Sequence, residues 1–205
     1  MQMGLLKAPF TTYYSAMENY PNIGKLLLAS QSPRRRELLD SLGIEFDVHA
    51  PNVDESVLAS EKPRAFAERL AGEKAAAISA DPKTVILAAD TIVVLGDWIL
   101  GKPADDQHAF DMLNRLSGHT HEVITGVCLR RGDRNVIFSV TTKVMFRTLE
   151  KGEILRYIAT GCPMDKAGAY AIQGGAAHMV KEIHGSYTNV VGLPLSEVHE
   201  KLLSL

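Results

Sequence analysis

The sequence predicts an α/β protein with a mixed central sheet flanked by helices. Short apolar runs of strand length alternate with segments in which apolar residues recur every three or four positions. Some neighbouring strands are separated only by short turns such as Gly96-Asp97, so they form antiparallel hairpins within the sheet. With 205 residues, of which 46% are hydrophobic, the chain is long enough to bury a core of its own.

The first helix follows directly from the first strand. Residues 25–29 form a short apolar run, and Ser32 and Pro33 are typical of a helix N-cap and a first helical position. We expect the helix to reach about Ser41, before Gly43 ends it.

The second helix has the clearest apolar face. Between residues 63 and 80, apolar side chains recur at spacings of three and four, and Asp81-Pro82 ends the pattern. The face consists of Phe66, Ala67, Leu70, Ala71, Ala75 and Ile78.

Seven further strands and three further helices are expected in the rest of the chain. Apolar and β-branched runs predict them at residues 44–49, 84–90, 92–95, 98–100, 121–129, 136–146 and 178–183. Three more helices are expected to begin at Asp105 or Asp106, at Thr148 and at Pro194. Residues 165–175 are expected to form a glycine-rich strand and loop.

Composition and charge exclude several classes of protein. The 22 basic and 24 acidic residues give a net charge of -2, which argues against a protein that coats nucleic acid. The longest apolar runs, 85–89 and 92–95, are too short to span a membrane. Cys128 and Cys162 are far apart, which indicates a reducing, cytoplasmic compartment. We expect residues 1–24 to be a loose N-terminal extension and residues 25–205 to be one domain.

The segment Ser30–Arg36 predicts an anion site. A strand leads through a turn to a helix N-terminus, where free backbone N–H groups and the helix dipole favour a negative charge. The Ser30 hydroxyl and the guanidinium groups of Arg34 and Arg35 add donors. Two arginines in a solvated first turn are the alternative.

Two carboxylates and two lysines form a second group of candidates. Asp90 ends an apolar strand, and ligands of α/β sheets bind at such strand ends. Glu55 lies in a polar loop, where a solvated side chain is the alternative. Lys74 lies at the edge of the apolar helix face, where it can also snorkel to solvent, and Lys102 follows a strand between Gly101 and Pro103.

A third group lies in the glycine-rich segment. Asp165 and Lys166 precede two short glycine-containing stretches, and glycines let a backbone approach a ligand closely. Gln173 offers both a donor and an acceptor, which recognition of a base edge requires.

Taken together and in order, these segments resemble the Maf family of nucleoside-triphosphate pyrophosphatases. The resemblance runs from about Lys25 to the C-terminus. It rests on the blocks Leu27–Arg35, Val53–Glu55, Glu73–Ala75, Ala89–Thr91, Gly101–Pro103, Leu116–Gly118, Asp165–Tyr170, Gln173–Gly174 and Val190–Pro194.

The resemblance implies a fold like that of inosine-triphosphate pyrophosphatases, with a cleft between two lobes, and often a homodimer. It implies hydrolysis of a nucleoside triphosphate to the monophosphate and pyrophosphate, with a divalent cation (Mg²⁺, Mn²⁺ or Co²⁺) as cofactor. Arg34, Thr91 and Gln173 resemble the branch that acts on dTTP and UTP. The alternatives are a 7-methyl-GTP pyrophosphatase and a nucleotide-binding regulator of septum formation. No nucleic-acid or membrane partner is expected.

The resemblance also implies a role for each candidate residue. Asp90 would be the proton acceptor, and Glu55 and Asp90 would hold the metal, with Lys102 beside them in catalysis. The residues expected to bind substrate are Ser30, Arg34, Arg35, Lys74, Thr91, Asp165, Lys166 and Gln173. Thr91 and Gln173 would face the pyrimidine.

Overall fold

The structure of the protein is a computed structural model, in which residue 20 and residues 23–205 are described. Most of the expected N-terminal extension lies outside the described residues, and the division of the chain at residue 24 stays a prediction. Tyr20 and Ile23 are described, and both are buried. The Tyr20 hydroxyl forms a hydrogen bond with Nδ1 of His199, so this point of the chain contacts the C-terminal helix.

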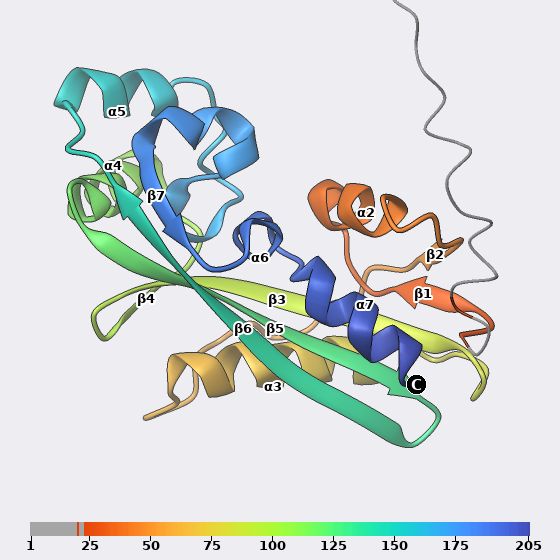
Figure 1. Ribbon diagram of the computed structural model, residues 1–205. Helices are drawn as coiled ribbons and strands as arrows, with labels where there is room; N and C mark the ends of the chain where they lie inside the picture. The colour runs from red at the N-terminus through yellow and green to blue at the C-terminus, as the bar shows by residue number, and fades with distance from the viewer. Residues whose placement is uncertain (1–19, 21–22) are drawn as a thin grey trace, which may run out of the picture.

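A seven-stranded mixed sheet forms the centre of the molecule, as the sequence predicts (Figure 1). Its order is β2-β1-β3-β5-β6-β7, with β4 also paired to β3. The strands are β1 (Leu26–Leu28), β2 (Asp47–Val48), β3 (Val85–Leu95), β4 (Trp98–Leu100), β5 (Thr120–Arg131), β6 (Arg134–Phe146) and β7 (Val180–His184). β1 runs parallel to β2 and β3, and the other ladders are antiparallel.

Helices cover both faces of the sheet (Figure 1). They are α2 (Pro33–Asp40), α3 (Pro63–Ala76), α4 (Asp106–Leu116), α5 (Lys151–Ile158), α6 (Tyr187–Val191) and α7 (Leu195–Leu203). α3 lies on one face, while α2, α6 and α7 lie on the other. Among the described residues, no helix is both long and apolar enough to cross a membrane.

Alternation along β3 divides the core between these two faces. Ile86 and Ala88 pack with Ala71 and Ala75 of α3, because side chains of the same parity point to one face of a strand. Val85, Leu87 and Ala89 point the other way and pack with α2 and α7. Asp90 therefore faces α3, and Thr91 faces the opposite side of the sheet.

The capping residues predicted from the sequence are largely confirmed. The Ser32 side chain accepts a hydrogen bond from the N–H of Arg35 at the start of α2, and Asp105 does the same for α4. All six residues of the expected apolar face of α3 are buried, although the helix ends at Ala76 and not at Ala80. Gly96-Asp97 joins β3 to β4 in the expected hairpin.

Two expectations for the C-terminal half are wrong, and one helix was not predicted. α5 begins after Glu150, so Thr148 is not its N-cap. Residues 165–175 contain no strand but form short helical turns, because positive φ angles at Gly168 (66°), Ala169 (58°) and Gly175 (90°) are incompatible with extended backbone. α6 was not expected.

Gly126 on β5 allows α3 to lie unusually close to the sheet. A Cβ atom at this position would be 2.2 Å from the carbonyl oxygen of Ala67 and 2.7 Å from the nitrogen of Glu68, both in the backbone of α3. Gly126 is also the register partner of Asp90. The absent side chain therefore sets the distance between α3 and the strand that carries Asp90.

Gly126→Ala is expected to lower the free energy of unfolding by about 1–3 kcal/mol, because the added methyl forces α3 away from the sheet. Urea denaturation measures this change. Gly101→Ala is the control, since a Cβ there meets no atom within 4 Å. Equal stability of the two variants would contradict the close approach of α3.

Candidate active site

The central cleft opens where one edge of β3 lacks a partner strand. β1 pairs with Val85–Leu87 and β4 with Val93–Leu95, both on the edge opposite β5. Within the described chain, residues 88–92 therefore have a ladder partner only on the β5 side. Side chains from both faces of β3 can reach this opening. A cleft of about 960 Å³ lies here, and both Asp90 and Thr91 line it.

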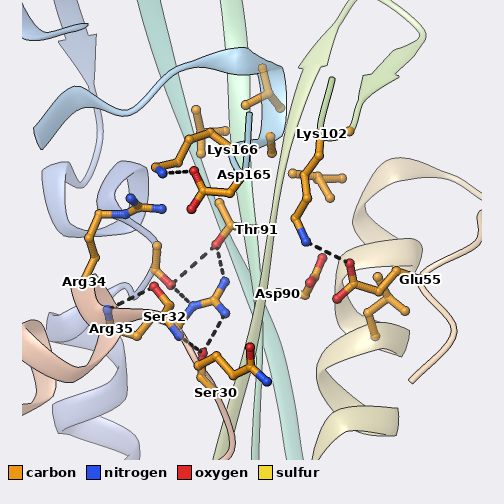
Figure 2. Close-up of a pocket in the computed structure, with 18 of the residues that line it drawn as sticks. Ser30, Ser32, Arg34, Arg35, Glu55, Asp90, Thr91, Lys102, Asp165 and Lys166 are labelled. Atoms are coloured by element: carbon orange, nitrogen blue, oxygen red, sulfur yellow. Dashed lines mark hydrogen bonds and ion pairs between the residues drawn. The ribbon is translucent and has the colours of Figure 1, made fainter. Parts of the chain in front are cut away.

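Lys74 joins the two carboxylates of the site. Its Nζ atom lies 2.6 Å from Oδ1 of Asp90 and 2.7 Å from Oε1 of Glu55. Lys74 is 9% exposed and Asp90 is 8% exposed, so Lys74 does not snorkel to solvent. Glu55 also lies 3.5 Å from Nζ of the exposed Lys102, and Figure 2 shows Glu55, Asp90 and Lys102 along one wall of the cleft. Glu55 therefore does not behave as an isolated loop carboxylate.

The lysines keep Glu55 ionised. Partial burial acts to raise the pKa of Glu55, but hydrogen bonding and charge from Lys74, with a smaller effect of Lys102, bring that pKa below its ordinary value. Nζ of Lys74 thus lies between the carboxylates of Glu55 and Asp90 and contacts both of them.

The opposite wall carries Arg34, Asp165 and Lys166 (Figure 2). Arg34 comes from the first turn of α2, and the other two residues precede the turn Ala167–Ala169. Lys166 forms an ion pair with Asp165, and this hydrogen bond lowers the pKa of Asp165. The two walls of the cleft thus both carry cationic groups.

Arg35 lies between the two walls and makes three contacts within the protein. Its Nε donates to the carbonyl of Gly192 at 2.8 Å, Nη1 to Oγ of Ser30 at 3.2 Å and Nη2 to Oγ1 of Thr91 at 2.9 Å. Burial lowers the pKa of Arg35, although the charge of Asp90 opposes this change. Among the described residues each of the three nitrogens has one acceptor, so two of the five N–H groups have none there.

Tyr170 and Gln173 border the cleft near the glycine-rich turns. Gln173 is exposed to the cleft, while Tyr170 is buried beside it. The Tyr170 hydroxyl lies 2.8 Å from Nε2 of the buried His121. Burial lowers the pKa of His121 to about 4, so this imidazole is neutral near pH 7. The segment that carries Gln173 is thereby attached to β5.

All the candidate residues named from the sequence line this one cleft. They are Ser30, Arg34, Arg35, Glu55, Lys74, Asp90, Thr91, Lys102, Asp165, Lys166 and Gln173. The sequence did not indicate Thr125 or Asn189 as functional residues. The Thr125 hydroxyl forms hydrogen bonds with the Thr91 hydroxyl and with the backbone carbonyl of Asn189. Only the register of β3 against β5 reveals Thr125, because it lies opposite Thr91 in that ladder.

Comparisons with known proteins agree on one family. A family model described as "Maf-like protein" matches residues 25–205. The "dTTP/UTP pyrophosphatase" of Geobacter sulfurreducens is 55% identical over 87% of this chain and 95% of its own length. The protein of the same name from Acinetobacter baylyi is 49% identical over 85% of this chain and 96% of its own.

One solved structure with a weak likeness is a HAM1 protein from Coxiella burnetii. It has a TM-score of 0.46 and 16% sequence identity, with 88% of this chain and 99% of that chain covered.

Lys74→Met is expected to lower the free energy of unfolding by roughly 3–5 kcal/mol, because it leaves the buried Asp90 carboxylate without its cation. Lys102→Met is the matched control. Lys102 is exposed and 3.5 Å from Glu55, so its loss is expected to cost less than about 1 kcal/mol. Urea denaturation at pH 7 compares the two variants, and similar small losses would show that Lys74 does not compensate the buried charge.

Proposed function

The chain belongs to the Maf family, and we propose that it hydrolyses dTTP and UTP to the nucleoside monophosphate and pyrophosphate. The observation that carries the proposal is the cleft in which Asp90 and Glu55 face Arg34 and Lys166. The relatives named dTTP/UTP pyrophosphatase support the substrate, since they match along most of their length.

The charges of the cleft suit a nucleoside triphosphate with a metal ion. Five cationic side chains and four carboxylates line the cleft. A triphosphate carries about four negative charges, and the lining alone does not neutralise them. The proposed reaction therefore needs further positive charge beyond that of the protein.

A divalent cation such as Mg²⁺, Mn²⁺ or Co²⁺ fits the donor set. Glu55 and Asp90 provide carboxylate oxygens, which hard cations prefer. The described residues contain no cluster of three or more His, Cys, Asp or Glu side chains that could hold a metal ion, so they offer this pair of carboxylates and no larger ligand set. Two carboxylates are sufficient for Mg²⁺, which usually keeps several waters and binds substrate phosphates. When bound, the cation would offset negative charge on the phosphate oxygens.

Asp90 is the proposed proton acceptor of the reaction. The carboxylate takes a proton from a water molecule as the water oxygen forms a bond to the α-phosphorus. The bond from the α-phosphorus to the bridging oxygen breaks, and pyrophosphate leaves with that oxygen. Lys74 holds Asp90 Oδ1 at 2.6 Å and so orients the carboxylate. Arg34, Lys102 and Lys166 are proposed to stabilise charge on the phosphates.

Base recognition is assigned to the segment around Gln173. Its amide can both donate and accept hydrogen bonds, as a uracil or thymine edge requires. It projects from a turn that contains Gly174 and Gly175, where the backbone can approach a ligand. Arg34 and Thr91 are the other two residues proposed to determine specificity.

The proposed location is the cytoplasm. Cys128 is buried and Cys162 is exposed, and both are free thiols. Burial raises the pKa of Cys128 to about 11, so this thiol is protonated and unreactive at pH 7.

A homodimer stays a prediction from the family resemblance.

Purified protein is expected to release pyrophosphate from dTTP and UTP only when Mg²⁺, Mn²⁺ or Co²⁺ is added. A substrate panel that includes 7-methyl-GTP measures the rates, and EDTA provides the metal-free control. The proposed substrate is wrong if 7-methyl-GTP is hydrolysed faster than both pyrimidine nucleotides. Binding of dTTP without pyrophosphate release would favour a nucleotide-binding regulator.

Asp90→Asn is expected to lower kcat for dTTP by about 100- to 10,000-fold, because the amide cannot accept the proton from water. The protein is expected to stay folded, since the amide oxygen can still accept from Lys74. Asp97→Asn, in the exposed β3–β4 turn, is the control. Steady-state kinetics and circular dichroism test both variants, and undiminished turnover of Asp90→Asn would remove Asp90 from the mechanism.

A further inference from the structure

The Arg35 guanidinium joins three segments that are far apart in the sequence. Its acceptors are Ser30 after β1, Thr91 on β3 and Gly192 after α6. Gly192 adopts φ of 126°, a conformation that L side chains rarely adopt, and its carbonyl points to Nε of Arg35. Any shift of Thr91 or of α6 therefore moves an acceptor of Arg35.

The hydroxyl groups of Thr91 and Thr125 form a chain of hydrogen bonds next to Arg35, and the carbonyl at its end fixes which group donates to which. The Thr125 hydroxyl donates to the backbone carbonyl of Asn189 at 3.1 Å, because a carbonyl can only accept. Its oxygen is then the acceptor for the Thr91 hydroxyl at 3.0 Å. Thr91 has a single hydroxyl proton, so its oxygen faces Arg35 as an acceptor. The Gly192 carbonyl, at 3.5 Å, is a second and longer acceptor for the same proton, so the Thr91 hydroxyl can meet a base only as an acceptor.

Thr125 and Asn189 lie at fully buried positions. Both residues have no exposed surface. The Asn189 side-chain amide donates to the carbonyl of Val123 at 3.0 Å and to Oγ1 of Thr142 at 2.9 Å. Asn189 thus fixes α6 to β5 and β6, and the Thr125 hydroxyl connects this anchored helix to Thr91.

We infer that Thr125 is a positioning residue for nucleotide binding and acts through Thr91 on Arg35. Thr125 does not line the cleft, so it cannot contact the substrate directly. Its hydroxyl orients Thr91 as an acceptor and contacts the carbonyl of Asn189. These two contacts hold the Thr91 and Gly192 acceptors that fix the Arg35 guanidinium at the cleft. The inference rests on the proposed function, because Arg35 must meet a nucleotide for its position to matter.

Thr125→Val is expected to lower kcat/KM for dTTP by about 10- to 100-fold, since small displacements of a binding group are costly even from a distance. Valine keeps the branched shape of threonine and has a methyl group in place of the hydroxyl. Thr125→Ser restores the hydroxyl and is expected to retain most of the wild-type value. If the effect were merely structural, the loss of kcat/KM would follow the loss of thermal midpoint in each variant. It would not depend on whether the side chain at position 125 carries a hydroxyl.

A double-mutant cycle with Arg35→Lys tests whether Thr125 acts through Arg35. In that background, Thr125→Val is expected to add no further loss of kcat/KM, because the two residues form one unit. Thr141→Val is the neutral control, since Thr141 on β6 is half-buried and makes no side-chain hydrogen bond within the described residues. Additive losses, or equal activities of the Val and Ser variants at position 125, would overturn the inference.

The dissociation constant of dTTP in EDTA, measured for the same variants, separates this inference from the proposed function. If the wild type binds dTTP but releases no pyrophosphate, the proposed function fails, and weaker binding by Thr125→Val alone still supports the positioning role. Equal binding by Thr125→Val, Thr125→Ser and the wild type would contradict that role. A wild type that neither binds nor hydrolyses dTTP would overturn both.

Discussion

The Lys74 ammonium between the Asp90 and Glu55 carboxylates is the interaction on which the site depends. A carboxylate as buried as Asp90 is costly without a partner, and Lys74 supplies that partner at 2.6 Å. The same ammonium binds Glu55 from the loop that precedes α3. Gly126 makes the contact feasible because it lets α3, which carries Lys74, lie against the sheet beside Asp90.

The incomplete pairing of β3 gives this strand access to one cleft from both of its faces. Asp90 reaches the cleft on the α3 side and Thr91 on the side of α6, since successive residues alternate. A strand paired along both edges would keep these side chains in separate environments. In the part of the chain that is described, neither β1 nor β4 pairs with residues 88–92. The acid–base chemistry proposed for Asp90 and the hydrogen bonds of Arg35 therefore meet in one cleft.

The sequence predicts much of this arrangement, because its strongest signals are local. Ser32 and Asp105 act as the expected caps, and the spacing of apolar residues locates the buried face of α3. The strand within 165–175 was expected wrongly, since left-handed backbone at Gly168 and Ala169 cannot be read from composition alone. The positioning role that we infer for Thr125 could not be predicted either, because it depends on the ladder partner Thr91, which is 34 positions away in the chain.

The most direct test is a crystal structure with Mg²⁺ and a dTTP analogue whose α–β bridging oxygen is replaced by an imido group. The α-phosphate is expected beside Asp90 and Glu55, with the other phosphates contacting Arg34, Lys102 or Lys166 and the thymine toward Gln173. An analogue bound with its α-phosphate away from Asp90, or outside this cleft, would contradict the proposed active site.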